Sequence, residues 1–237
     1  MAPARRLAAV VFLASAPGCG SDLLLPDPPG GGENVALSKV TGDGQTGTVG
    51  EPLSDPLVVR VMTVRDLPAT GRKVAFVFTS SAGEVSPDTA ITNDDGQAAA
   101  RWVLGTQPGP HTVEAKLADL EGETQTTEFT AQAIAAAPDT LSPLSPQSQP
   151  GRRGHEVGSA PVVRVVDRFG NPVPGVSVAW QVLAGEGQVS EPITLTGDDG
   201  TTTVRWTLGD RIGVHKLNVA IGPVHGSPVT FTATVLF

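Results

Sequence analysis

The chain has 237 residues, including 28 glycines, 21 prolines and a single cysteine, and its formal net charge is −8. This much glycine and proline disfavours a helical protein, and a hydrophobic fraction of 39% is too high for a disordered one. An acidic chain without a run of lysine or arginine is also a poor match for nucleic acid, which requires a basic surface. The composition predicts short strands joined by tight turns, with room for two domains of about 100 residues each.

Residues 1–18 have the layout of a secretory signal peptide, because Arg5 and Arg6 precede an apolar run of about ten residues that is too short to span a bilayer. Residues 16–19, Ala-Pro-Gly-Cys, resemble the lipobox of bacterial lipoproteins, in which the signal is cut before a cysteine that becomes lipidated. The resemblance implies that Cys19 is a membrane anchor, and Gly20 after it implies the outer membrane. The alternatives are ordinary cleavage, which leaves a secreted protein with a free thiol, and an uncleaved signal.

A tether and two copies of one unit follow the signal. Residues 19–33 are rich in proline and glycine without periodicity and are predicted to form a flexible tether. The sequence VVRVM at residue 58 returns as VVRVV at residue 162, and DDG at residue 94 returns at residue 198, so both are separated by 104 residues. These repeats divide the rest of the chain into a first copy, residues 34–136, and a second copy, residues 137–237.

Apolar and polar residues alternate within each copy, which is the period of half-buried strands. In residues 203–208, for example, Val204, Trp206 and Leu208 alternate with polar residues. About seven such segments per copy predict an all-β fold of two tandem immunoglobulin-like antiparallel β-sandwiches. A single cysteine cannot form an intrachain disulfide, so aromatic residues are expected in the cores: Phe76, Trp102 and Phe129 in the first copy, and Trp180, Trp206 and Phe231 in the second.

Residues 162–209 of the second copy, together with SPVTFTATV at residues 227–235, resemble the group 1 bacterial immunoglobulin-like repeat of invasin and intimin. The residues that carry the resemblance are Asp167, Gly170, Asn171, Pro172, Gly175, Asp199, Gly200 and Phe231. In the first copy Asp66 and Leu67 stand where the second copy has Gly-Asn, and a different turn is expected there. The resemblance implies adhesion or another surface interaction, with a protein or a glycan as partner, although a fold by itself does not supply a function.

The Asp-Asp-Gly of each copy is a candidate metal loop, a candidate pair of catalytic carboxylates or a turn. A calcium loop requires ligands at alternating positions and a later glutamate, but no acidic residue follows closely after Gly96 or Gly200. Adjacent carboxylates on a turn also cannot face each other across a cleft as in a glycosidase. Glycine accepts a positive φ, and Asp95 or Asp199 can accept backbone N–H bonds, so two hairpin turns without a metal are predicted.

The histidines and arginines form no catalytic pattern. The four histidines lack the spacing of zinc ligands: His111, His155, His215 and His225. Of these, His111 and His215 are equivalent and are expected at the surface or at a strand edge. No nucleophile elbow, phosphate-binding loop or zinc-protease motif is present.

Two pairs of arginines occupy equivalent strand positions: Arg60 with Arg164, and Arg101 with Arg205. They are expected to keep a sheet face soluble and to pair with acids. The alternative is a basic stripe that binds acidic glycans.

The sequence therefore predicts a non-enzymatic, lipid-anchored protein of the cell envelope that displays two immunoglobulin-like domains for adhesion or for binding a protein or glycan. Its partners would be a membrane, through the anchor, and a surface ligand, and no cofactor, metal or nucleic acid is expected. A structural spacer or envelope-assembly component without its own ligand is the alternative. A hydrolase hidden on the sandwich is a third hypothesis, and no convergent set of acid, base and nucleophile in the sequence favours it.

Overall fold

The computed structural model describes residues 35–78, 83–119 and 125–236. Within these ranges the chain forms β-strands and no helix, which confirms the predicted all-β class. Among the same residues there is accordingly no helix long and apolar enough to span a membrane. The predicted signal peptide (1–18), the tether (19–33) and the anchor Cys19 lie outside the described residues.

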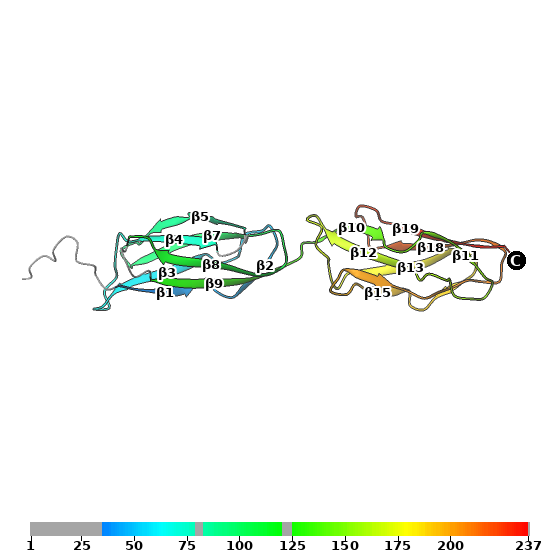
Figure 1. Ribbon diagram of the computed structural model, residues 1–237, viewed down its shortest axis with the longest axis horizontal. Helices are drawn as coiled ribbons and strands as arrows, with labels where there is room; N and C mark the ends of the chain where they lie inside the picture. Colours follow the sequence, from blue (N-terminus) through cyan, green and yellow to red (C-terminus); the bar gives the residue numbers. More distant parts are fainter. Residues whose placement is uncertain (1–34, 79–82, 120–124, 237) are drawn as a thin grey trace, which may run out of the picture. The chain divides into compact units, whose positions relative to one another are not determined.

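The first copy is built from two sheets (Figure 1). One has the strand order β1-β3-β7-β5 and the other has the order β2-β9-β8-β4-β6. Their bounds are β1 (Val35–Thr41), β2 (Gln45–Thr48), β3 (Leu57–Thr63), β4 (Lys73–Phe78), β5 (Gly83–Ser86), β6 (Thr89–Ile91), β7 (Gln97–Leu104), β8 (Gly109–Leu117) and β9 (Thr126–Ile134).

The second copy repeats this arrangement with equivalent strands (Figure 1). Its larger sheet has the order β11-β19-β18-β13-β15, and the opposite layer contains the sheets β10-β12-β16 and β14-β17. The bounds are β10 (Pro138–Pro143), β11 (Ser148–Gly151), β12 (Val162–Asp167), β13 (Ser177–Ala184), β14 (Gln188–Val189), β15 (Ile193–Leu195), β16 (Thr201–Thr203), β17 (Trp206–Thr207), β18 (Gly213–Ala220) and β19 (Val229–Val235).

The strand that is continuous as β7 in the first copy is divided into β16 and β17 in the second. The interruption lies beside Pro161, which occupies the position of Leu57 in the first copy. Leu57 pairs with Ala100 inside the β3–β7 ladder. Proline has no amide hydrogen to donate to a neighbouring strand, so the ladder of the second copy is weaker at this point.

The predicted alternation of inward and outward residues is confirmed. Val204, Trp206 and Leu208 are buried, whereas Arg205 between them is exposed. Along β19, every second residue from Val229 to Val235 is buried in the same way. Because successive side chains of a strand point to opposite faces, this pattern places one face of each sheet in the interior.

One strand pair in each copy is parallel, an exception to the predicted antiparallel sandwich. β2 runs parallel to β9, and β11 runs parallel to β19. In both copies the chain passes from one sheet (β1 or β10) directly to the opposite one (β2 or β11). A Cβ on Gly47 would lie 2.8 Å from Cδ1 of Leu104, and one on Gly151 would lie 2.3 Å from Cδ1 of Leu208. The two glycines therefore allow these short strands to lie close to the core.

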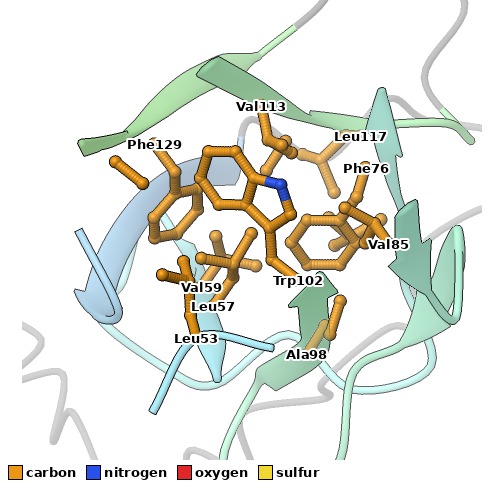
Figure 2. Packing of buried hydrophobic residues seen from close by; sticks show 14 of the residues in the cluster. Leu53, Leu57, Val59, Phe76, Val85, Ala98, Trp102, Val113, Leu117 and Phe129 are labelled. Carbon is orange, nitrogen blue, oxygen red and sulfur yellow. The ribbon is translucent and has the colours of Figure 1, made fainter. Parts of the chain in front are cut away.

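Trp102 lies at the centre of the first core, as Figure 2 shows. Its indole packs between the two sheets, near Phe129 on one side and Phe76 on the other. All three aromatic side chains are buried. At about 25 cal/mol per Å² of buried apolar surface, large aromatic residues contribute more to such a core than the surrounding valines.

The second core has the same plan around Trp206 and Phe231, both fully buried. Trp180 is also buried, and its Nε1–H donates to Oγ1 of Thr194 at 2.8 Å. Nε1 of Trp206 has no hydrogen-bond partner in the described part of the chain. The buried residues of the two cores form separate clusters, which supports the proposed division of the chain into domains 34–136 and 137–237.

Candidate binding surface

The two Asp-Asp-Gly segments form tight turns, with positive φ at Gly96 (70°) and Gly200 (72°). In the second copy Oδ1 of Asp199 accepts hydrogen bonds from the amide (2.9 Å) and the hydroxyl (2.7 Å) of Thr201. These bonds lower the pKa of Asp199 below its ordinary value. In the first copy the side chain that accepts is Asn93 rather than Asp95. The backbone amide of Asp95 donates to Oδ1 of Asn93.

Replacing Gly200 with alanine is expected to lower the free energy of unfolding by about 1–3 kcal/mol. The added Cβ would be forced into a positive φ and would lie 2.5 Å from the carbonyl oxygen of Val165. Gly170→Ala is the matched control, because Gly170 also has a positive φ (84°) but nothing lies within 4 Å of its Cβ position. Equal losses in the two variants, measured by urea unfolding, would contradict a role for the Val165 contact.

A second turn, at residues 167–171, is organised by the buried carboxylate of Asp167. Oδ1 accepts from the amides of Phe169 and Asn171, each at 2.9 Å. Oδ2 accepts from Nδ2 of Asn171 and from the amide of Ala136, each at 3.0 Å. Burial alone raises the pKa of Asp167, but these hydrogen bonds outweigh that effect and hold the pKa below its ordinary value. Pro172 follows the turn and forms an isolated bridge to β12.

The side chains of this turn also reach residues of the first copy. Nη2 of Arg168 lies 2.8 Å from Oε1 of Glu51, and Nδ2 of Asn171 donates to the carbonyl oxygen of Thr106 at 2.8 Å. The ion pair is about half exposed and is therefore worth no more than about 1 kcal/mol. The carboxylate of Glu51 is nevertheless paired with an arginine of the same chain, Arg168.

The expectation of a different turn in the first copy is wrong. Asp66 has a φ of 57°, close to the 84° of Gly170, and its amide donates to the carbonyl of Thr63 just as Gly170 donates to Asp167. The amide of Thr63 in turn donates to the carbonyl of Leu67, which repeats the pairing in the second copy. Aspartate tolerates the left-handed region better than most residues, so both sequences support one geometry.

Of the two places expected for His111 and His215, the surface is wrong, because both are buried. Each lies near the start of its strand, β8 or β18. In each, Nε2–H donates at 2.9 Å to a carbonyl four residues earlier, that of Gln107 or Arg211. Nδ1 has no partner within the described residues in either copy. The imidazoles therefore hold the loops before β8 and β18 against the sandwich and are unavailable to a ligand.

The arginines at equivalent strand positions behave differently from one another. Arg205 is exposed, and its Nη1 lies 3.8 Å from a carboxylate oxygen of Glu156. Arg60 and Arg164 are partly buried, and their Nε atoms are buried without a hydrogen-bond partner among the described residues. Arg205 thus pairs with an acid as predicted, and the charge of Arg164 helps to lower the pKa of Asp199, whereas no ion pair joins Arg60 or Arg101 to an acid among the described residues.

A pocket of about 470 Å³ lies at one end of the second copy, where the parallel strands β11 and β19 finish side by side. It is hereafter called the end pocket, and it is lined chiefly by Pro150, Gly151, Arg152, His155, Glu156 and Leu236. Pro150 and Leu236 are exposed and form an apolar wall. Thr234 pairs with Pro150 across the two strands and adds a hydroxyl group.

The polar groups of the end pocket combine both signs of charge. Nδ1–H of His155 donates to the carbonyl of Arg153 at 2.7 Å, which fixes the orientation of the ring. Nε2 is then the nitrogen that can accept a hydrogen bond. Glu156 lies near Arg205, as described above. Arg152 is exposed and has no ion-pair partner in the described ranges. The guanidinium of Arg152 is therefore available to a carboxylate or phosphate from outside the chain.

Sequence reasoning named His155 but not the end pocket. The signal was present in the repeat, because TVGEPL at residues 48–53 is replaced by RRGHEV at residues 152–157. No set of three or more histidine, cysteine, aspartate or glutamate residues able to hold a metal occurs in the part of the chain that the structure describes. The end pocket combines charged groups of both signs with an apolar wall.

Comparison with known proteins identifies the fold. No protein-family model matches the sequence. The solved structure of the Escherichia coli adhesin FdeC is similar, with 20% sequence identity and a TM-score of 0.59 over 86% of this chain and 64% of FdeC. Two Yersinia pseudotuberculosis proteins have lower TM-scores at 19% identity: InvD (0.48, over 85% of this chain and 57% of InvD) and the adhesin InvE (0.42, over 86% and 61%).

The chain thus spans less than two thirds of each of these three structures. At 20% identity, the likeness to FdeC bears on the fold alone. Together with the strand arrangement, it confirms the predicted all-β fold of immunoglobulin-like β-sandwiches.

Proposed function

We propose that the chain is a non-enzymatic module of the bacterial cell envelope that uses its immunoglobulin-like sandwiches for adhesion, by binding a protein or glycan. The observation that carries the proposal is the shared fold with FdeC, which is an adhesin. The end pocket supports it, because an apolar wall beside an arginine that has no ion-pair partner among the described residues provides a surface that a ligand can recognise.

Cys19 is proposed as the lipid anchor that holds this module at the envelope, in the outer membrane. The support is the sequence alone: a signal-peptide layout at residues 1–18 followed by a lipobox-like segment that ends at this cysteine. Residues 33–237 form one compact unit, and the proposed tether (19–33) would join that unit to the anchor.

Adhesion is tested with beads coated with residues 33–237. Coated beads are expected to bind epithelial cells or an array of cell-surface glycans above beads that carry an unrelated β-sandwich of similar net charge. Binding at the control level, with the fold intact by circular dichroism, would contradict adhesion and favour a spacer without its own ligand.

The lipid anchor is tested separately, by the intact mass of the full-length protein from membranes. A diacyl or triacyl mass is expected on Cys19, and Cys19→Ser is expected to leave the membrane fraction. Unmodified protein in the medium would contradict the anchor.

A further inference from the structure

We propose that the end pocket binds a carboxylated saccharide, such as a uronic acid unit, with the guanidinium of Arg152 on the sugar carboxylate. This inference rests on the proposed function and specifies the ligand class for one surface of the module. It draws on three observations: the difference between the two copies at equivalent positions, the unpaired charge, and the shape of the pocket.

The first observation is that the two copies differ in charge where their backbones agree. Gly50 and Gly154 occupy equivalent positions and have similar positive φ values, 72° and 65°. Residues 48–53 contain one acid, Glu51, and no base, for a net charge of −1. Residues 152–157 contain two arginines and one acid, for a net charge of +1 with neutral histidine. Because the same fold accommodates both sequences, the basic residues are not required by the fold.

The second observation concerns how these charges are used. In the first copy the carboxylate of Glu51 is paired with Arg168 at 2.8 Å. At the end of the second copy, Arg211 pairs with Glu186 and Arg205 lies near Glu156, whereas Arg152 and Arg153 have no ion-pair partner in the described ranges. An unpaired guanidinium presents two parallel N–H donors, the geometry that a carboxylate accepts in a bidentate manner.

The third observation is the shape and lining of the pocket. Its volume of about 470 Å³ lies within the range of small-molecule sites and accommodates one or two sugar rings. Pro150 and Leu236 provide an apolar surface for the C–H face of a ring. Glu156, the hydroxyl of Thr234 and Nε2 of His155 can exchange hydrogen bonds with sugar hydroxyls. A ligand with one carboxylate, several hydroxyls and an apolar face matches this set.

The test is an NMR titration of residues 33–237 with digalacturonate, and with neutral maltose as the control sugar. Digalacturonate is expected to shift the amides of Gly151, Gly158 and Thr234 in a saturable manner, and maltose is expected to leave them unchanged. Arg152→Gln is expected to weaken binding by at least about tenfold, because it removes the charge-assisted pair. Arg65→Gln, in the exposed turn of the first copy, is the matched control and should bind like the wild type.

A second variant combines Arg152→Thr, Arg153→Val and His155→Glu, the residues of the first copy at these three positions, and keeps Glu156 and Val157. It is expected to abolish binding while the remaining amide spectrum shows an intact fold. No saturable shift, equal shifts with maltose, or unchanged binding in Arg152→Gln would each overturn the proposal. Tighter binding of a tetraglutamate peptide than of digalacturonate would also overturn it, in favour of an acidic protein segment. Should the coated beads adhere while digalacturonate fails to bind, only this inference falls and the adhesive function stands.

Discussion

Replacing Trp206 with alanine is expected to lower the free energy of unfolding of the second copy by about 3–5 kcal/mol and to leave the first copy folded. Trp206 is fully buried at the centre of the second core, so its removal leaves a large cavity. The buried residues of the first core form a separate cluster that does not include Trp206. The loss should therefore be confined to one half of the chain.

Two-dimensional NMR during urea unfolding separates the two copies, because each has its own resolved amides. Trp102→Ala is the matched variant and should destabilise only the first copy. Trp206→Phe should lose less than Trp206→Ala, since it keeps most of the ring volume and removes an indole N–H that has no partner among the described residues. A common loss of both copies in either alanine variant would contradict the division into domains 34–136 and 137–237.

Asp167→Ala is expected to lower the free energy of unfolding by about 2–4 kcal/mol. The carboxylate accepts four hydrogen bonds, three of them from backbone amides, and it is buried. Its removal leaves the amides of Phe169 and Asn171 without their acceptor. Asp167→Asn should lose less, because the amide oxygen can replace one of the two carboxylate oxygens.

The same carboxylate makes stability depend on pH. The folded pKa of Asp167 is lowered, so its contribution is fully present above the unfolded value near 3.9 and is lost as the pH falls through the folded pKa. Wild-type stability should therefore decrease below about pH 4 more steeply than that of Asp167→Asn. The difference between the two curves isolates Asp167, since Asp43 and Asp199 also have lowered pKa values. Parallel curves from pH 7 to pH 2, measured by urea unfolding, would contradict this assignment.

Local sequence was sufficient wherever the physical cause was local. The alternation around Trp206 predicted which face of the strand is buried, because the geometry of an extended chain sends successive side chains to opposite sides. The Asp-Asp-Gly turns were predicted from the tolerance of glycine for positive φ. The sequence did not predict that Asn93 accepts the backbone amides of the first turn, because Asn and Asp side chains can accept the same amides equally well.

The burial of His111 and His215 was not predicted, because both are polar residues at the starts of strands. The alternation does indicate it: His111 is in phase with buried Val113 and Ala115, and His215 with buried Leu217 and Val219. Their loops fold back so that a carbonyl four residues earlier accepts the Nε2–H bond, and this satisfied bond makes burial possible. Asp66 likewise adopts the conformation of Gly170 because the same backbone hydrogen bonds are formed around it.

The sequence by itself determined the class of the fold, the two copies and the inward face of each strand, because these follow from residue periodicity and from repetition at 104 residues. Only the tertiary structure decided where a pocket forms. The end pocket exists because β11 and β19, more than 75 residues apart in the sequence, finish side by side as parallel strands (Ser148 pairs with Thr232). That pairing brings Pro150, Arg152 and Leu236 together, and contacts over such separations depend on the packing of the whole sandwich rather than on any local preference of the chain.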